Sequence, residues 1–353
     1  MKHVVTVVGA RPQFVKAAVV SAALAKAGIH EELIHTGQHY DFKMSEVFWR
    51  DLGLKQPEVN LGIGSGSHAT QTAAMLVAIE KFLLAASPKP DGVIVYGDTN
   101  STLAAALAAS KLHIPVVHVE AGLRSFNMQM PEEVNRIITD RLSDVLFCSS
   151  NVGADHLKRE GISDGVHITG DVMYDAVKTF SPIAEQKVTL SSLVPFESGG
   201  YHLATIHRPS NTNTPAHMES ILSAIGACGT PVVWPVHPRN KAKLANYTLP
   251  DNLTTMEPAS YFEMLVLLGN CRKVLTDSGG LQKEAYWLGK PCVTLREETE
   301  WVETLEHGWN HITGADGAKI AIALSQDPSA GQQDIYGSGD ASTQIAQILT
   351  DLN

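Results

Sequence analysis

The sequence predicts an α/β protein built from two parallel, doubly wound sheets that face each other across a cleft. Short apolar runs, rich in β-branched residues, alternate with longer helical patterns along most of the chain. Repeated strand–helix units of this kind favour a parallel sheet. The alternation lapses at about residues 175–200 and then resumes, which divides the pattern into two halves. A chain of 353 residues is long enough for two domains of ordinary size.

The strand candidates of the first half share an apolar core and are mostly followed by small or polar residues. They are Val4 to Val8, Glu32 to His35, Gly92 to Tyr96, Val116 to Val119, Val145 to Cys148 and Val166 to Thr169. Two stretches between them have a helical pattern: Gln13 to Ala27, and Thr99 to Lys111, which is rich in Ala and Leu.

The second half repeats the pattern after a turn or linker at Glu197 to Gly200. Its strand candidates are Tyr201 to Ile206, Pro231 to Trp234, Leu253 to Met256, Lys273 to Thr276 and Pro291 to Leu295. The predicted domains are therefore a Rossmann-like unit at 1–174 and a second at 175–340. A final helix within 341–353, about Ala341 to Leu352, is expected to pack back on the first domain.

The composition is that of a globular protein, with 44% hydrophobic and 18% charged residues. A net charge of -10 and the lack of a basic stripe argue against nucleic-acid binding. No apolar run is long enough to span a bilayer, and the apolar start is interpreted as mature protein. The cysteines lie far apart, as Cys148, Cys228, Cys271 and Cys292. They are expected to be thiols in a reducing cytoplasm, not disulfides or a metal site.

Carboxylates stand where a parallel sheet presents residues to a ligand. Glu120 directly follows the strand Val116 to Val119, and Asp98 follows the strand Gly92 to Tyr96. Glu132 comes shortly afterwards, at the start of a helix opened by Pro131. Because ligands bind at the carboxyl ends of such strands, we expect Asp98, Glu120 and Glu132 to meet at one crevice. Alternatively, Asp98 caps a helix and Glu132 is an ordinary first-turn residue.

A short glycine-containing segment in the second half has the features of an anion site. Asp277-Ser278-Gly279-Gly280 follows the strand Lys273 to Thr276 and opens a helix that runs to Leu288. Small residues at a helix start leave N–H groups for an anion such as pyrophosphate. Glu284, one turn further, could accept hydrogen bonds from ribose hydroxyls. Alternatively, the segment is a helix cap with glycines for tight packing.

Basic side chains also lie at predicted strand ends. Arg11 and Lys16 follow the first strand in a segment that lacks the G-x-G-x-x-G fingerprint. They could meet phosphate or a developing anion, or be solvated cations. His207 and His237 end two strands of the second half and could serve a phosphate or a leaving group, or be structural. Zinc is not expected, because neither H-E-x-x-H nor a Cys/His ligand spacing is present.

Together these segments resemble the non-hydrolysing UDP-N-acetylglucosamine 2-epimerase family over nearly the whole chain. The matching segments are Gly9 to Pro12, Thr36 to His39, Gly97 to Thr99, His118 to Arg124, Pro131 to Arg136, His207 to Arg208, Asp277 to Gly280 and Tyr336 to Asp340. The resemblance implies a GT-B-like fold, a homodimer without a cofactor, and inversion at C2 of a UDP-2-acetamido sugar. In that reaction UDP leaves by anti elimination, and re-adds to the 2-acetamidoglycal.

The resemblance also implies roles for residues that match the family motifs. Acid/base roles fall to Asp98, Glu120 and Glu132, with Arg136 and Lys16 supporting the charged site. The alternative for Arg136 is a plain helix ion pair with Glu132 or Glu133. The implied diphosphate ligands are Arg11, His207, Ser278, Gly279 and Gly280, and the implied ribose ligand is Glu284. The implied regulatory or substrate-proximal residues are Gln38, His39 and His237.

Some positions depart from the family pattern. Lys283 replaces a common second Glu, and Trp301 stands in a segment that usually reads Thr-Glu-Arg-Pro-Glu. Asp41 and Ser67 do not match the activator site of some members, so allosteric activation is not expected. The segments at Tyr40 to Ser45, Leu123 to Asn127 and Thr299 to Val302 resemble UDP-2,3-diacetamido-2,3-dideoxyglucuronate 2-epimerases.

Three other functions remain open on the sequence alone. A GT-B glycosyltransferase would use a UDP-sugar and share the diphosphate site, but would not need carboxylates on both faces of C2. A nucleotide-sugar sensor would gain nothing from an acidic cluster. A hydrolytic epimerase would release free N-acetylmannosamine.

Overall fold

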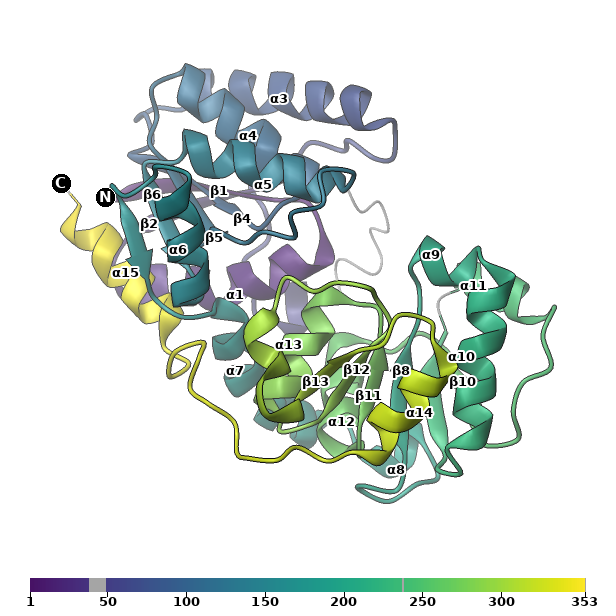
Figure 1. Cartoon of the computed structure of the whole chain (residues 1–353). Coiled ribbons are helices and arrows are strands. Elements are labelled where there is room, and N and C mark those ends of the chain that lie inside the picture. The colour runs from purple at the N-terminus through teal and green to yellow at the C-terminus, as the bar shows by residue number, and fades with distance from the viewer. Residues whose placement is uncertain (38–48, 237, 353) are drawn as a thin grey trace. The chain divides into compact units, whose positions relative to one another are not determined.

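The structure is a computed structural model and describes residues 1–37, 49–236 and 238–352. It consists of two compact units, Met1–Ala176 with Asp334–Asn353, and Val177–Gln333. Each unit contains one parallel sheet with helices between its strands (Figure 1). The predicted α/β class is therefore confirmed.

The first unit contains a seven-stranded sheet in the order β3-β2-β1-β4-β5-β6-β7. The strands are β1 His3–Val8, β2 His30–His35, β3 Val59–Asn60, β4 Gly92–Tyr96, β5 Val116–Ala121, β6 Val145–Cys148 and β7 Val166–Ile168. From β1 the chain goes to one side and then returns to β4 on the other, so the order reverses between β1 and β4. Ligands bind at such a switch point, outside the carboxyl ends of the strands.

The helices of the first unit connect these strands. They are α1 Arg11–Lys26, α3 His68–Ala85, α4 Asn100–Lys111, α5 Pro131–Leu142, α6 Asn151–Arg159, α7 Val172–Lys187, which continues into the second unit, and α15 Ala341–Asp351. The predicted helices at α1, α4 and α15 are confirmed to within two residues at each end. Helix α3 and the two-residue strand β3 were not predicted.

The second unit contains a six-stranded sheet in the order β10-β9-β8-β11-β12-β13. The strands are β8 His202–Thr205, β9 Val232–Pro235, β10 Leu253–Met256, β11 Val274–Thr276, β12 Cys292–Thr294 and β13 Asn310–Ile312. The order reverses between β8 and β11, so the turns after these strands lie at this unit's switch point. The last strand, β13, was not predicted.

Helices also connect the strands of the second unit. They are α8 Leu190–Leu193, α9 Pro209–Thr212, α10 Pro215–Ala227, α11 Pro238–Leu244, α12 Tyr261–Asn270, α13 Gly279–Trp287, η1 Val302–Gly308 and α14 Gly317–Ser325. Each unit has its own apolar core, with Val5 and Val95 buried in the first, and Trp234 and Leu275 in the second. The strand ends of each unit are thus fixed by that unit's own packing.

The segment that follows the second unit rejoins the first. In Figure 1, α15 lies along α1, with the two chain ends near each other. The Met1 nitrogen donates to the carbonyl oxygens of Leu349 and Leu352, each at 2.5 Å. Asp175 accepts from the N–H groups of Ala341 at 3.1 Å and Ser342 at 2.7 Å. These bonds fix both ends of α15 on the first unit.

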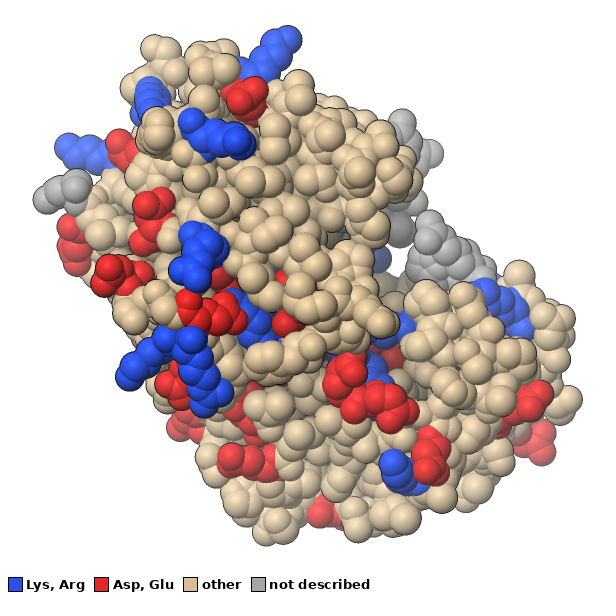
Figure 2. Space-filling view, turned by 45° about the horizontal axis from the view of Figure 1, so that its top comes forward, with Lys and Arg blue, Asp and Glu red and all other residues tan. Residues whose placement is uncertain are grey.

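Charged side chains of both signs are scattered over the face shown in Figure 2. Among the residues coloured there, no stripe of Lys and Arg crosses the surface. No helix in the described ranges is both long and apolar enough to cross a membrane.

Candidate active site

The backbone at Glu120 has an uncommon conformation. This residue lies in β5 with a φ of +73°, and the pairing of β5 with β6 shifts register between Val119 and Ala121. A non-glycine residue in the left-handed region is strained by about 1–3 kcal/mol, and such strain gathers at functional sites. The irregularity turns the carboxylate of Glu120 away from the regular strand pleat.

Lys16 of α1 forms an ion pair with Glu120, and both side chains are buried. The two groups lie against Gly97, which follows β4 and has a φ of +60°. A Cβ atom on Gly97 would lie 3.3 Å from Oε2 of Glu120 and 3.4 Å from Nζ of Lys16. A glycine is therefore required at this position by its φ and by the close approach of the ion pair.

Asp98 is held by α5. Its carboxylate pairs with Arg136, and its carbonyl oxygen accepts from Nδ2 of Asn135 at 2.9 Å. The alternative that Asp98 caps a helix is wrong, because Thr99 is the N-cap of α4 and accepts from Thr102 N at 3.3 Å. The Asp98 carboxylate is thus available to Arg136 and to a ligand.

Arg136 also pairs with Glu133, at 2.9 Å between Nη1 and Oε2. The helix ion pair considered for Arg136 is confirmed for Glu133, and Asp98 is a further partner. Glu133 is buried and accepts from the N–H groups of Ser125 at 2.9 Å and Phe126 at 2.8 Å. Glu132, in contrast, is exposed on the first turn of α5. Sequence reasoning missed Glu133 as the buried carboxylate of this helix.

The turn after β1 places Arg11 at the first position of α1. Burial lowers the pKa of the Arg11 guanidinium from its ordinary value. The side chain of Gln13 accepts from the N–H groups of Gly9 at 2.8 Å and Ala10 at 3.0 Å. It also donates to the carbonyl oxygen of Tyr96 at 2.8 Å, which ties this turn to the end of β4. This structural role of Gln13 was not predicted. Because Gln13 is uncharged, the cation of this turn is Arg11.

In the second unit, Asp277 holds the turn after β8. This fully buried carboxylate accepts from the N–H groups of His207 at 3.0 Å and Arg208 at 2.9 Å, and from Nδ2 of Asn211 at 3.0 Å. It also lies 2.9 Å from Nδ1 of His207, whose side chain is 53% exposed. With Nδ1 directed at Asp277, the ring presents Nε2 outward, so Asp277 orients His207.

The helix α13 begins directly after Asp277. Ser278 is its N-cap but makes no side-chain capping bond, and the first turn has no acidic residue. A Cβ atom on Gly280 would have nothing within 4 Å, and one on Gly279 would make only ordinary contacts, the nearest at 3.6 Å. The alternative that these glycines serve tight packing is therefore wrong. The helix start is open to an anion.

Further along α13, Glu284 is buried, and Lys283 precedes it in the helix. Nζ of Lys283 lies 3.6 Å from the ring centroid of Trp301 and 5.6 Å from that of Trp287. The two departures from the family pattern, Lys283 and Trp301, thus contact each other as a cation–π pair.

We expect the stability contributed by Asp277 to depend on pH. Burial alone would raise the pKa of Asp277, but hydrogen bonds and charge from His207 and bonds from Arg208 and Asn211 hold it below its ordinary value. A carboxylate with a lowered folded-state pKa stabilises above its unfolded pKa and loses that contribution as pH falls. Asp277→Asn is expected to lower the free energy of unfolding by about 3 kcal/mol at pH 7, and by less at pH values below about 4.

Urea unfolding at both pH values measures this difference. Asp251→Asn, at an exposed aspartate of the same unit, is the control and should change stability little at either pH. An equal loss for Asp277→Asn at both pH values would contradict the assigned charge state.

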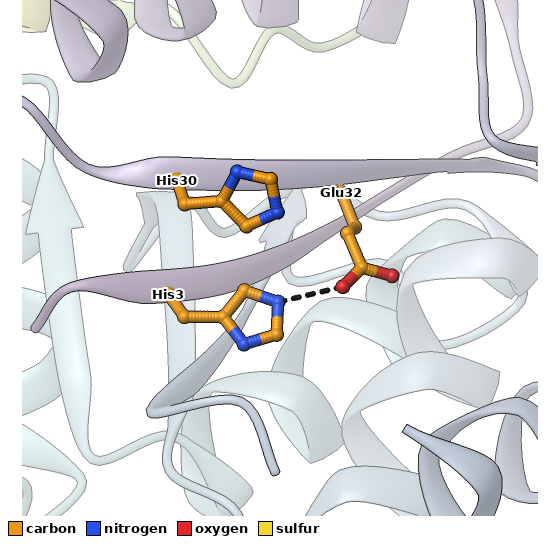
Figure 3. Close-up of side chains that lie close together, drawn as sticks. All are labelled: His3, His30 and Glu32. Atoms are coloured by element: carbon orange, nitrogen blue, oxygen red, sulfur yellow. Dashed lines mark hydrogen bonds and ion pairs between the residues drawn. The ribbon is translucent and has the colours of Figure 1, made fainter. Parts of the chain in front are cut away.

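One group of described residues has the composition of a metal site. His3, His30 and Glu32 bring ligand-type atoms within 4.8 Å of one another (Figure 3). They lie in β1 and β2, where His3 and His30 are register partners at the amino end, opposite the turns described above. A 2.8 Å hydrogen bond between Nε2 of His3 and Oε1 of Glu32 accounts for the closest contact.

The predicted site residues Gln38, His39 and His237 lie outside the described residues, as does the segment Tyr40 to Ser45. The other predicted site residues fall into two sets. The first unit contains Arg11, Lys16, Asp98, Glu120, Glu132 and Arg136, and the second contains His207, Ser278, Gly279, Gly280 and Glu284.

Two parallel α/β units, each with candidate site residues at its switch point, define a GT-B-like protein, and solved structures agree. The chain has a TM-score of 0.90 to a Methanocaldococcus jannaschii UDP-GlcNAc 2-epimerase in complex with UDP-GlcNAc and UDP, at 38% identity, covering 99% of this chain and 100% of that one. For a Neisseria meningitidis UDP-GlcNAc 2-epimerase bound to UDP-GlcNAc, the TM-score is 0.87 at 30% identity, covering 99% and 100%.

Sequence comparison gives the family. The sequence profile of the UDP-N-acetylglucosamine 2-epimerase family matches residues 22–350. A Methanococcus maripaludis UDP-N-acetylglucosamine 2-epimerase homolog is 46% identical over 99% of each chain. The Pseudomonas aeruginosa UDP-2,3-diacetamido-2,3-dideoxy-D-glucuronate 2-epimerase is also 46% identical over 99% of each. The chain belongs to the UDP-N-acetylglucosamine 2-epimerase family, and the predicted isomerase class is confirmed.

Proposed function

We propose that this protein inverts C2 of a UDP-2-acetamido sugar, in the direction UDP-GlcNAc to UDP-ManNAc or its reverse. UDP leaves by anti elimination to give a 2-acetamidoglycal, and then adds back as the proton returns to the other face of C2. The observation that carries this proposal is the pair of carboxylates, Glu120 and Asp98, at adjacent strand ends, each beside a cation.

The chemistry needs these residue types. The C2–H bond is poorly acidic, so a positioned base must act as the C1–O bond breaks. Return of the proton to the opposite face requires an acid there. Glu120 and Asp98, with Glu132 on α5, are the proposed acid/base groups. Lys16 pairs with Glu120 and Arg136 pairs with Asp98, and these contacts hold both carboxyl groups in place.

The leaving UDP must stay bound between elimination and re-addition. The open start of α13 at Ser278 to Gly280 is the proposed diphosphate site, with His207 of the same unit as a further ligand. Arg11, at the turn after β1, is the proposed anion-binding cation of the first unit. Glu284, one turn along the same helix, is the proposed ribose ligand. No metal is required, because helix N–H groups and cations supply the charge.

The substituents at C3 and C5 of the sugar define two candidate substrates. A relative named as a UDP-N-acetylglucosamine 2-epimerase homolog and the UDP-2,3-diacetamido-2,3-dideoxy-D-glucuronate 2-epimerase are each 46% identical to this chain, and two relatives named UDP-N-acetylglucosamine 2-epimerase are 39% identical. Trp301, in the segment that resembles the second group, lies against Lys283 and near Gly279 of the proposed diphosphate site. We therefore propose the diacetamido uronate as the second candidate substrate.

We also propose a cytoplasmic homodimer. The exposed apolar side chains Val77 and Leu84 on α3, which has only Glu80 and Lys81 as charged residues, support a subunit contact there. All four cysteines are free thiols, which supports a reducing compartment. Sedimentation of Leu84→Glu against the wild-type protein tests the dimer, since a charge at that contact should dissociate it.

Proton NMR in heavy water tests the function. With UDP-GlcNAc, and separately with the diacetamido uronate, we expect deuterium at C2 and a manno-configured product, and the faster substrate is the preferred one. No exchange with either, with UDP released only when a sugar acceptor is added, would instead identify a glycosyltransferase. Release of free N-acetylmannosamine would identify a hydrolytic epimerase.

Gly97→Ala is expected to lower kcat about tenfold or more with little change in UDP affinity. Its Cβ would press on both Glu120 and Lys16, and a displacement of reacting groups by a fraction of an ångström slows proton transfer. Gly53→Ala is the control, because Gly53 has a similar φ of +63° but nothing within 4 Å. Equal rates for the two variants would show that the ion pair tolerates the methyl group.

A further inference from the structure

His118 is a fully buried side chain of β5, and both of its ring nitrogens face oxygen atoms. Nε2 lies 2.8 Å from the carbonyl oxygen of Gly97, and Nδ1 lies 2.7 Å from Oδ1 of Asp140. A backbone carbonyl can only accept, so Nε2 carries a proton. The state of Nδ1 depends on whether Asp140 is ionised.

Asp140 is a fully buried residue of α5 that is surrounded by donors. Its carboxyl accepts from Nη1 of Arg124 at 2.7 Å and from the N–H group of Gly122 at 3.2 Å. Burial by itself would raise the pKa of Asp140, but the hydrogen bonds and charges of His118 and Arg124 hold it below its ordinary value. Arg124 is always protonated, and its buried guanidinium donates at 2.7 Å to the buried Asp140. That pairing makes Asp140 a carboxylate, which can only accept, so Nδ1 of His118 must donate to it. His118 therefore carries protons on both nitrogens.

The charges of this cluster balance only with a protonated His118. Arg124 also forms two bonds of 2.7 Å with the carboxylate of Glu160. Two carboxylates, Asp140 and Glu160, then face two cations, Arg124 and His118. Glu160 is partly exposed, so only Asp140, Arg124 and His118 are fully buried. Because buried charges are costly unless paired, a cationic His118 stabilises the ionised Asp140 beside it.

Asp140 connects to the turns at both strand ends. The Asp140 carboxylate accepts from His118, whose other ring nitrogen donates to the carbonyl of Gly97, the residue before Asp98. The same carboxylate accepts directly from the N–H group of Gly122, two residues after Glu120. The same helix, α5, carries Arg136, the partner of the Asp98 carboxylate. One buried carboxylate thus fixes both turns relative to α5.

We propose that His118, held as an imidazolium by Asp140, is a positioning residue that sets Asp98 relative to Glu120 for proton transfer at C2. The inference rests on the proposed function. His118 is fully buried and does not touch substrate, so its effect passes through the Gly97 carbonyl. A misplacement of about 1 Å at reacting groups is enough to cost roughly a hundredfold in rate.

Two variants separate the two contacts of the imidazole. His118→Asn retains a donor near the position of Nδ1 but is too short to reach Gly97, whereas His118→Gln can still donate to Gly97. We expect His118→Asn to lower kcat about a hundredfold and His118→Gln to lower it less, with KM and UDP affinity within about threefold of wild type. Rates are expressed per folded protein, so lower stability alone changes neither value.

His202→Asn is the matched control. His202 is a buried histidine on β8 of the second unit, and burial lowers its pKa to about 4, so its loss removes no charge pair. We expect lower stability but unchanged kcat. A kcat for His118→Asn within twofold of wild type, or a loss equal to that of His202→Asn, would overturn the proposal.

Two readouts do not depend on turnover. In ¹⁵N-histidine NMR of the full chain, His118 should show protons on both ring nitrogens, and these signals should vanish in His118→Asn. In crystals of His118→Asn, the Asp98 carboxylate should move relative to Glu120. An unprotonated ring nitrogen, or an unmoved Asp98, would refute the positioning role. Absence of C2 exchange in the wild-type enzyme would instead refute the proposed function.

Discussion

Glu120→Gln is expected to lower kcat by at least about 10³-fold while UDP still binds as tightly as to the wild type. Loss of a positioned acid or base costs about 10²–10⁴-fold, and Glu120 occupies the strained position beside Lys16. The amide can neither take nor return a proton. Deuterium incorporation at C2 measures the chemical step, and calorimetric titration with UDP measures binding.

A second variant separates catalysis from stability. Gln at 120 leaves the Lys16 ammonium buried without its carboxylate, which is expected to destabilise the fold by about 3–5 kcal/mol. The double variant Lys16→Met/Glu120→Gln removes that charge and should recover much of the stability, but none of the turnover. Substantial activity in either Gln variant would exclude Glu120 from the proton transfer.

Gly122→Ala is expected to destabilise the protein by about 4 kcal/mol, more than most single substitutions. Gly122 has a φ of +79°, and a Cβ atom on it would lie 2.3 Å from the carbonyl oxygen of Gly153 and 2.6 Å from its carbonyl carbon. Those atoms belong to the backbone of α6 and cannot rotate away. Urea unfolding followed by circular dichroism measures the loss.

Gly161→Ala isolates the conformational part of that effect. Gly161 has a nearly equal φ of +77° but nothing within 4 Å of its Cβ position. The alanine there should cost only about 1–2 kcal/mol, the strain of a left-handed residue. Similar losses for the two variants would mean that the strand-end turn and α6 can separate at little cost.

Reasoning from strand ends located the carboxylates that lie at the switch point of the first sheet. Asp98 and Glu120 were placed because polar residues directly followed apolar runs, and that pattern is local in the sequence. Which of Glu132 and Glu133 is buried could not be predicted from the local sequence. It depends on which face of α5 is buried, and Glu133 is the residue that reaches the backbone of Ser125.

Contacts that depend on register could not be predicted. His118 was read as one residue of a buried strand, because its partners, Gly97 and Asp140, come from a neighbouring strand end and a helix. The alternative that Asp98 caps α4 also could not be excluded from the sequence. Asp98 and Thr99 are both good caps, and only the ion pair of Asp98 with Arg136 shows why Thr99 takes that role.

The two departures from the family pattern, at Lys283 and Trp301, are explained by one contact. Lys283 and Trp301 lie apart in the sequence and looked like unrelated changes, yet the ammonium lies over the indole ring. A substitution at one position therefore constrains the other. Lys283→Glu alone is expected to lower stability, because it replaces the cation–π contact with Trp301 by a buried carboxylate.

Because α15 packs on the first unit, that unit can complete its folding only after the end of the chain has been made. Ile345 and Leu349 of α15 are completely buried, so the unit with the proposed catalytic carboxylates lacks part of its core until they are made. The second unit, Val177–Gln333, has all its residues before α15 exists. On the ribosome, the part of the enzyme proposed to hold UDP can therefore fold to completion before the part proposed to move the proton.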